Sequence, residues 1–545
     1  MADTTGGTLL GHSWTTVWNA PPAVRAVFGL RALSVVAFLV FGIGLYTDAF
    51  TARHYSDDFY FIYGDSPHSV AYWFVHTNPY NVLAYRPLES VIYAALQKAF
   101  GAFNAAPLHA VNFGMHVTLA WLTLHVMLQL GFTRTQSLLG ASYGLVSEVQ
   151  VPAVAGLDSL SQMMGAALGS ISIWLLWRSL WSRSLADGTW RQRPNMGLLG
   201  WSVTTFLLAL FSKETSFGFF VSLSLLVGMW GFHARHYPSG AVRAAPYLIP
   251  YAACTLVALG VRGWVGGRGP TFGFGRYDLQ FGFNNIAENV MSTVAGWAMP
   301  FSTAQVYLAI QGGHVWSVAL MAAGTSLFIV FVTWGVWRSV HLQRCASLTL
   351  LTMAIAALLP VMFMHMSELY LYNSMPFISI IVGTGLGTFL ERMRSKAPQR
   401  RVAGIVMMLA IAVLLSAHAF AVRQKVSLMK RQGERAAELL QKITAHAKHL
   451  PPGGQLVLLE QPSEEPKYSV YVMHGFDPIR EGTRYVKEMS GRPDIQVDLY
   501  STADPKALDR LPSEAVVLSL ESSGDVLVVN RDPNFLAPPS RKPAQ

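Results

Sequence analysis

Apolar runs about as long as a membrane-spanning helix alternate with short polar connections between residues 32 and 421. A hydrocarbon core about 30 Å thick needs about 20 apolar residues of helix to cross it. The pattern therefore predicts an α-helical polytopic membrane protein with about 11 transmembrane helices. The expected spans are 32–50, 108–130, 137–155, 160–180, 197–212, 215–232, 244–261, 315–337, 346–364, 374–391 and 402–421.

Lysine and arginine residues in the connections predict which loops are cytoplasmic. They precede the first expected span and follow the fourth, sixth, eighth and tenth, the last group lying within 392–401. Cytoplasmic loops carry such an excess, so we expect the N-terminus inside and the C-terminus outside. The apolar segment 286–311 would place 392–401 outside if it also spanned the membrane. We therefore interpret it as an interfacial or re-entrant piece that is buried in protein.

The composition changes after Arg423. Residues 424–448 carry charged side chains around Leu, Ile and Ala at helical spacing, and short apolar runs separated by turn residues follow. Such runs predict strands, expected here at 455–459, 468–473, 495–500, 515–520 and 526–529. The predicted organisation is a cytoplasmic segment 1–31, a membrane domain 32–423 with an outer loop 51–107, a small extracytoplasmic α/β domain 424–534 and a disordered tail 535–545.

The composition supports a membrane protein. Of 545 residues, 52% are hydrophobic and only 13% are charged, whereas a soluble chain is about 25% charged. The net charge of +10 fits the cytoplasmic excess of Lys and Arg better than nucleic-acid binding. Cys254 and Cys345 lie in or beside apolar runs and predict no disulfide framework. No cleavable signal peptide is expected at the start of the sequence.

Two adjacent acids, Asp57 and Asp58, follow the first expected span and lie among aromatic residues. Carboxylates commonly start helices, so capping is the simple interpretation. A partly dehydrated, aromatic neighbourhood can also raise a carboxylate pKa into the range of a general base. Neighbouring side chains on a helix diverge by about 100°, so one acid can activate an acceptor while the other positions something else. We expect Asp57 to be the base, with Asp58 as the second candidate.

Two cations at outer helix ends could hold a phosphate. Arg86, in the motif YRPLE, offers a guanidinium fork that suits phosphate, although a snorkelling side chain is equally simple. Lys213, in the motif FSKETSF, lies at a helix break, where it could partner a lipid phosphate or neutralise Glu214. We expect Arg86 and Lys213 to bind the donor phosphate, and Tyr85 and Glu214 to line the sugar or acceptor pocket.

Three further acids are placed where charge is costly. Glu148 lies inside the third expected span, Asp158 at its outer end, and Glu368 in an outer turn. Ionisable residues in spans usually face a cavity or a partner, so we expect all three in the sugar or acceptor pocket, with a buried ion pair as the alternative. The histidines show no metal-binding spacing, so no metal is predicted, although a divalent ion stays possible.

The order of these motifs resembles the C-type (GT-C) membrane glycosyltransferases, and most closely the TMTC-type protein O-mannosyltransferases and their bacterial relatives. The resemblance covers residues 30–390. The matching motifs, in chain order, are Asp57-Asp58, Tyr85-Arg86-Pro87-Leu88, Pro107-Leu108-His109 with Asn112 and His116, Glu148 with Asp158, Ser212-Lys213-Glu214, and Glu368 with Tyr370-Leu371-Tyr372.

This resemblance implies a polyprenyl-phosphate sugar donor, an inverting transfer at the outer membrane face and a catalytic Asp in the first outer loop. It also implies a bacterial inner membrane and a protein, lipid or polysaccharide acceptor. The sequence departs from the family pattern at four positions. Tyr143 and Val146 stand where relatives have His, and Gly156 and Leu369 stand where relatives have Arg. A small α/β domain replaces the helical repeats of the eukaryotic members.

Two other classes of function remain open from the sequence. A polytopic transporter or flippase of lipid-linked sugars would place coupling charges near the midplane, which suits Glu148, but it often shows an inverted repeat, and none is evident here. A membrane scaffold with a partner-binding outer domain would leave Asp57, Arg86 and Lys213 without a role.

Overall fold

The computed structural model describes residues 22–62, 69–77, 85–181, 190–191, 193–234, 244–266, 281–301, 305, 309, 312–363, 368–393, 398–460, 479–501, 515–520 and 526–528. The strand expected at 468–473, the tail 535–545 and most of the segment 1–31 lie outside these residues. The division into domains at 31, 423 and 534 stays a prediction.

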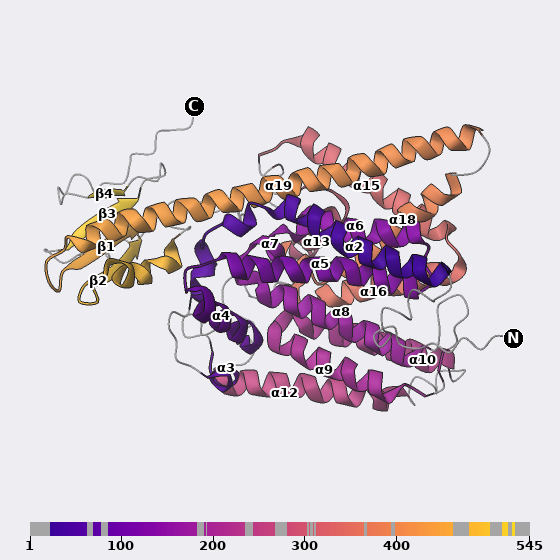
Figure 1. The fold of residues 1–545 in the computed structure, drawn as a ribbon, viewed down its shortest axis with the longest axis horizontal. Coiled ribbons are helices and arrows are strands. Elements are labelled where there is room, and N and C mark those ends of the chain that lie inside the picture. Colours follow the sequence, from indigo (N-terminus) through magenta and orange to yellow (C-terminus); the bar gives the residue numbers. More distant parts are fainter. Residues whose placement is uncertain are drawn as a thin grey trace.

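Long helices packed into one bundle make up most of the described chain (Figure 1). They are α2 (Pro22–Tyr46), α5 (Ala106–Gln129), α6 (Arg134–Val146), α8 (Leu160–Leu180), α9 (Met196–Ser212), α10 (Gly218–Ala234), α12 (Ile249–Gly266), α15 (Val315–Arg338), α16 (His341–Leu358), α18 (Met375–Met393) and α19 (Pro398–Lys448). Shorter helices are α3 (Val70–Val75), α4 (Pro87–Phe100), α7 (Val151–Ala155), α13 (Phe283–Ala298), α17 (Glu368–Leu371) and α20 (Val486–Ser490).

Within the described residues, seven helices are long and apolar enough to cross a membrane, and 32–46 and 196–212 form shorter apolar helices. The predicted class, a helical polytopic membrane protein with a small C-terminal α/β domain, is confirmed. The expected number of about 11 transmembrane helices stays a prediction, as does the interfacial placement of 286–311. In that segment α13 packs on α15 and α17, and the Asn289 side chain donates to the Met362 carbonyl at 2.8 Å.

One expected span is not a continuous helix. Residues 137–155 form the end of α6, the 3-10 turn η3 (Glu148–Gln150) and α7, and a second 3-10 turn, η4 (Leu157–Ser159), follows. Extended backbone at Ser147 ends α6, and Pro152 lies in the first turn of α7, where its missing N–H costs no hydrogen bond. Glu148, expected inside the third span, and Asp158, expected at its end, therefore both lie at helix breaks.

Glycines let three of the helices approach closely. A Cβ added at Gly383 of α18 would meet the Gly140 backbone of α6 at 2.5 Å, and one added at Gly335 of α15 would meet the Gly385 carbonyl of α18 at 2.0 Å. Small residues at such crossings allow backbone contact between membrane helices. The contacts hold α18 between α6 and α15.

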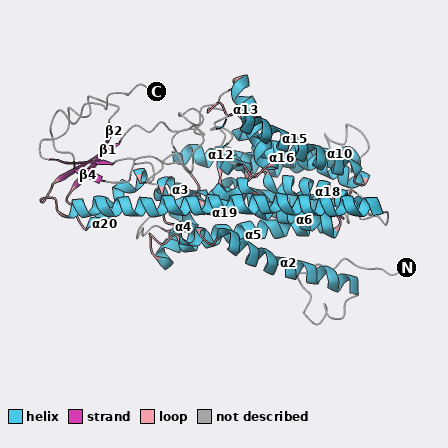
Figure 2. Ribbon diagram, turned by 90° about the horizontal axis from the view of Figure 1, so that it is seen from above, coloured by secondary structure: helices cyan, strands magenta, loops and turns pink. Residues whose placement is uncertain are grey.

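Helix α19 connects the bundle to the C-terminal domain. Its 51 residues correspond to about 75 Å of helix, more than twice the thickness of a hydrocarbon core of about 30 Å. The part beyond Arg423, where charged residues begin, therefore projects out of the apolar zone. Figures 1 and 2 show it carrying the sheet at the end of the bundle where α3 and α4 also lie.

The C-terminal sheet contains four of the five predicted strands. They are β1 (Gln455–Glu460), β2 (Gln496–Ser501), β3 (Val516–Leu520) and β4 (Val526–Val528), in the order β2-β1-β3-β4. Strand β1 pairs in parallel with β2 and β3, and β4 is antiparallel to β3. Side chains of β1 such as Leu456 and Leu458 are fully buried in a cluster that also contains α19 residues such as Leu439 and Ile443. This packing fastens the sheet to the end of the long helix.

The close crossing of α15 and α18 makes Gly335→Ala a destabilising change. The added methyl group has no room beside the Gly385 carbonyl, and overpacking of this kind costs about 1–3 kcal/mol. We expect a lower melting temperature in detergent. Gly260→Ala on α12, where nothing lies within 4 Å of the added Cβ, is the matched control and should melt at or above the wild-type temperature. Equal melting of both variants would contradict this packing.

Candidate functional site

The loop after α2 contains a short 3-10 helix, η2 (Ser56–Phe61), that carries the acid pair. Asp58 is 4% exposed, and its carboxylate accepts from three backbone N–H groups. Oδ2 accepts from Tyr55 at 3.2 Å, which caps η2. Oδ1 accepts from Leu157 at 3.1 Å and from Asp158 at 3.0 Å, both in η4. Asp58 therefore joins two loops that lie about a hundred residues apart.

The two adjacent acids occupy different environments. Asp57 is exposed, whereas Asp58 is buried, as expected from the angle between neighbouring side chains on a helix. Burial raises the pKa of Asp58 well above its usual range, and the negative charges of Asp158 and Asp57 add to the rise, while the backbone N–H groups oppose it. Asp58 therefore has the capping role of the simple interpretation, whereas the Asp57 side chain is exposed.

A carboxylate binds two arginines, one at the start of α4 and one near the C-terminal end of α12. Glu214, in the 3-10 turn η5 (Glu214–Phe217), accepts from Arg86 Nη2 at 2.8 Å and from Arg86 Nε at 3.3 Å. Arg262 Nη1 lies 3.4 Å from the same carboxylate. The Arg262 guanidinium also lies 5.7 Å from the centre of the Tyr85 ring. Arg86, expected as a phosphate ligand, thus presents its fork to a carboxylate of the protein.

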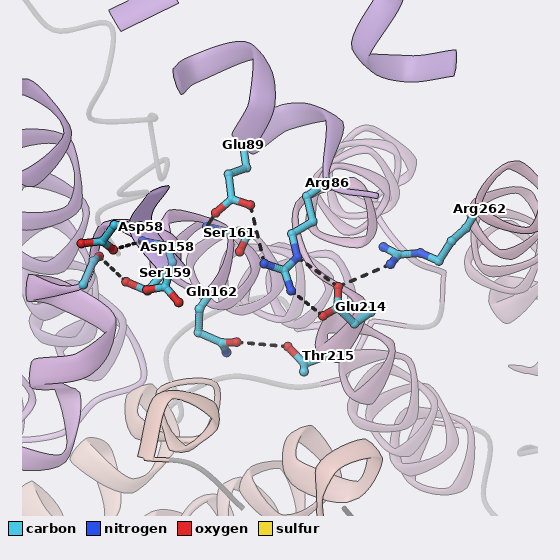
Figure 3. Close-up of polar contacts among 11 residues, drawn as sticks. Asp58, Arg86, Glu89, Asp158, Ser159, Ser161, Gln162, Glu214, Thr215 and Arg262 are labelled. Atoms are coloured by element: carbon cyan, nitrogen blue, oxygen red, sulfur yellow. Dashed lines mark hydrogen bonds and ion pairs between the residues drawn. The ribbon is translucent and has the colours of Figure 1, made fainter. Parts of the chain in front are cut away.

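A second buried acid faces Arg86 from the first turn of α4. Glu89 is fully buried, its Oε1 accepts from the Ser161 N–H at 2.7 Å, and its Oε2 lies 3.7 Å from Arg86 Nη1. Burial raises the pKa of Glu89 to about 7, against the opposing effect of Arg86 and Lys213. Figure 3 shows Glu89 between the acids Asp58 and Asp158 on one side and the Arg86–Glu214–Arg262 group on the other.

Lys213 is a buried cation. It ends α9 in extended conformation and is 3% exposed, and among the described residues it forms no ion pair. The centre of the Tyr370 ring lies 6.0 Å from Nζ. Burial and the charge of Arg86 lower the pKa of Lys213 to about 8, against the opposing effect of Glu214, Glu89 and Asp158. An additional anion would stabilise the protonated, charged form of Lys213 in this buried position.

The Asp158 carboxylate is the other group without a direct partner. It is half-buried, and in the described part of the chain its oxygens accept no hydrogen bond from another residue and form no ion pair. Its charge acts on Lys213 and on Asp58. The structure thus brings together Asp58, Tyr85, Arg86, Asp158, Lys213 and Glu214 from the sequence-predicted set, with Asp57 at the outer edge.

Glu148 and Glu368 belong to a separate buried cluster. Lys425 of α19 forms an ion pair with Glu148 and another with Glu368, the latter at 2.7 Å. The Glu148 N–H also donates to His418 Nδ1 at 3.3 Å. The ion-pair alternative raised for these acids is thus realised in the structure. Their place in a sugar or acceptor pocket is not tested by this geometry.

A ring of buried polar side chains lies next to Glu214 in the chain. Thr215 donates to Gln162 at 3.4 Å, Gln162 donates to Asn373 at 2.5 Å, and Asn373 donates back to Thr215 at 3.2 Å. The ring ties η5 to α8 and to the turn after α17. It gives the charged cluster a fixed, hydrogen-bonded support.

Sequence reasoning missed Glu89, Arg262, Lys425, Gln162 and Asn373 as members of these clusters. Glu89 ends the YRPLE motif, so a signal was present. Arg262 follows the seventh expected span, at an end predicted to lie outside, where no excess of cations is expected, and that is a second readable signal. Lys425 is one of several cations in α19, and nothing in its spacing distinguishes it from a solvated residue.

The comparisons with known proteins find similarity among solved structures. No family profile matches the sequence, and no curated protein matches it. Among solved structures the chain is similar to ArnT from Cupriavidus metallidurans, in a crystal structure with undecaprenyl phosphate bound. The two share 12% sequence identity and a TM-score of 0.45, over 91% of this chain and 94% of that one.

The pKa of Lys213 predicts how anion binding should depend on pH. If a phosphate binds the ammonium form, affinity is full below pH 8 and falls as the pH rises through about 8, by about tenfold per unit. Glu89, with a pKa of about 7, is already ionised over this window. Binding of a short-chain polyprenyl phosphate, measured between about pH 7.5 and 9.5, checks this. Lys213→Met should bind weakly at every pH, and a flat wild-type profile would contradict the assignment.

Proposed function

We propose that this protein is a membrane glycosyltransferase that transfers a sugar, with inversion, from a polyprenyl-phosphate-linked donor to an extracytoplasmic acceptor. The observation that carries the proposal is Lys213, a cation that is 3% exposed, lies within electrostatic reach of three carboxylates and forms no direct ion pair among the described residues. A buried charge without a partner is costly, and ionisable groups at membrane depth generally mark a binding site. A donor phosphate supplies the missing anion.

The charges around Lys213 favour an anionic ligand. Three cations, Lys213, Arg86 and Arg262, face two carboxylates, Glu214 and Glu89. The pKa of Glu89 is about 7, so near neutral pH this acid carries only part of its charge. With the charge of Asp158 also counted, the cluster is near neutral when all three acids are ionised and becomes net positive as Glu89 takes up a proton. We assign Lys213 as the main phosphate contact, with Arg86 as the second.

The carboxylates on the other side suit the acceptor. In the reaction the acceptor hydroxyl attacks the anomeric carbon, the bond from that carbon to the phosphate oxygen breaks, and polyprenyl phosphate leaves. The hydroxyl proton passes to a carboxylate base. Asp158 is our first candidate, because no other residue in the described chain hydrogen-bonds its oxygens and Asp58 holds its backbone. Asp57, the preference from sequence, is the second candidate, and Asp58 has a positioning role.

The remaining predicted pocket residues separate into two groups. Tyr85 and Glu214 border the cationic side of the cluster, and we retain them as proposed pocket residues. Glu148 and Glu368 bind Lys425, and we assign them a structural role in holding α19 against the helix break at η3.

One observation favours the transporter alternative. The Lys425–Glu148–Glu368 cluster is buried beside a broken helix, and transporters place coupling charges at such breaks. A transporter would move a lipid-linked sugar across the membrane unchanged, whereas a transferase breaks the sugar–phosphate bond. The chemical form of the sugar after reaction therefore distinguishes the two functions.

Single Asp→Asn changes test the proposed chemistry. We expect Asp158→Asn to reduce transfer of radiolabelled sugar from a polyprenyl-phosphate donor by about 10²–10⁴-fold, the usual contribution of a general base. Donor binding should persist, because Lys213 and Arg86 are intact. Asp57→Asn should show the smaller loss, and Asp58→Asn should also loosen the η4 turn.

Two results would argue against this assignment. Wild-type turnover in Asp158→Asn and Asp57→Asn, at normal expression, would remove both candidates for the base. Movement of intact lipid-linked sugar across vesicle membranes, with no free polyprenyl phosphate formed, would replace the transferase by the flippase.

The site is proposed to face the outside, with the C-terminal domain on the same side. Labelling with a membrane-impermeant maleimide tests this. In a Cys254→Ser variant the one remaining cysteine is exposed Cys345, at the start of α16, and it should be labelled only after the cells are lysed. Exposed Glu438 of α19, replaced by Cys in a chain that also carries Cys345→Ser, should react in intact cells. The opposite labelling pattern would invert the topology and place the acid pair inside.

A further inference from the structure

The η2 helix depends on outside partners for its conformation. It has six residues, and an isolated helix this short is unstable in water. Ser56 at its start has φ of 50°, a left-handed conformation that costs a non-glycine residue energy. At its C-terminal end the Phe59 carbonyl accepts from the Ile62 N–H only at 3.4 Å, a long hydrogen bond, so other elements must fix this end of the helix.

The partners come mainly from the C-terminal domain. The Tyr485 hydroxyl lies 2.6 Å from the Ile62 carbonyl oxygen and 3.1 Å from that of Phe59. The Arg484 guanidinium also donates to the Phe59 carbonyl. Both belong to the 3-10 helix η9 (Arg480–Tyr485). From the membrane domain, Gln97 donates to the Phe61 carbonyl at 2.7 Å.

Aromatic side chains also pack at the contact between η9 and η2. Tyr485 is 5% exposed, and its ring centre lies 6.3 Å from that of Phe59 and 5.6 Å from that of Phe103. Arg484 lies 5.6 Å above the Tyr60 ring. A Cβ added at Gly482 would meet the Phe59 ring at 3.0 Å. The interface is therefore apolar and closely packed around three polar contacts, two from Tyr485 and one from Arg484.

Helix α19 places η9 at this position. A Cβ at Gly433 would meet the Arg53 carbonyl at 2.4 Å, and Lys430 lies 3.5 Å from Asp48. These contacts join the projecting part of α19 to the chain just before η2, and α20, which follows η9, packs on α19. The C-terminal domain is thus held beside the acid-bearing loop from two directions.

We propose that the C-terminal domain is a working part of the active site, and that Tyr485 and Arg484 are positioning residues for its acids. They fix the carbonyl end of η2, η2 fixes Asp58, and Asp58 holds the N–H groups of Leu157 and Asp158. The catalytic consequence rests on the function proposed above. The structural link from η9 to η4 does not depend on that function.

Amide hydrogen exchange of the full-length protein in nanodiscs tests the link without any substrate. Tyr485→Phe keeps the ring and removes the hydroxyl, so exchange should rise about two- to tenfold, the equivalent of one hydrogen bond, in peptides covering 55–62 and in peptides covering 157–158. Protection of β1 and β3 should be unchanged. Tyr500→Phe, in β2 of the same domain, is the matched control and should leave both regions as in wild type.

Three outcomes would overturn the proposal: no change at 55–62, a rise at 55–62 without one at 157–158, or the same rise in Tyr500→Phe. If Tyr485→Phe also increases exchange in β1 and β3, the domain has unfolded. The Arg484→Lys variant then replaces it, and the same three outcomes would overturn the proposal. Lysine keeps the charge but replaces the planar fork.

Sugar-transfer kinetics then test the catalytic part separately. We expect kcat of Tyr485→Phe to fall about tenfold while KM for the donor stays near wild type, because Lys213 and Arg86 lie on other elements. A raised KM with unchanged kcat would overturn the positioning role. If wild type transfers no sugar, the proposed function fails, and the exchange result still decides whether the domain controls the η4 turn.

Discussion

The carboxylate of Asp58 is the contact on which the geometry of the site depends. Three N–H groups from two separate loops converge on it. Removing one partner of a buried hydrogen bond leaves the others unsatisfied and costs about 1–3 kcal/mol. The loop after the first helix and the turn before α8 therefore keep their relation only while Asp58 is in place.

The charged residues around this contact divide the site into two sides. On one side are the acids Asp58 and Asp158, with exposed Asp57 beyond them. On the other, Glu214 draws the guanidinium groups of Arg86 and Arg262 together. Lys213 lies within electrostatic reach of both sides. The proposed reaction needs a base for the acceptor hydroxyl and a cation for the leaving phosphate, and this division of charge offers both.

The sequence was sufficient for the architecture. Long apolar runs predict the bundle helices, and the short runs bounded by turn residues predict the strands of the C-terminal sheet at nearly the observed positions. Helix α6 ends earlier than predicted, although Pro152 was a readable signal of the break. The acid pair, Arg86 and Lys213 were found because charged residues at the ends of apolar runs are few and conspicuous.

Long-range pairing could not be predicted in the same way. Nothing local shows that Lys425 meets Glu148 and Glu368, that Glu214 takes up the fork of Arg86, or that Tyr485 reaches a carbonyl more than 420 residues earlier. These contacts depend on how the helices cross and on where the long α19 carries the C-terminal domain. A single sequence contains both residues of each pair but does not show which residues come into contact.

The most direct test of the central claim is a structure of the protein with a bound polyprenyl phosphate. The account predicts the phosphate oxygens at hydrogen-bond distance from Lys213 Nζ, on the side that faces Asp158, with Asp58 still bound to the η4 backbone. A phosphate bound elsewhere, with Lys213 Nζ paired to Asp158 or Glu89 instead, would contradict it.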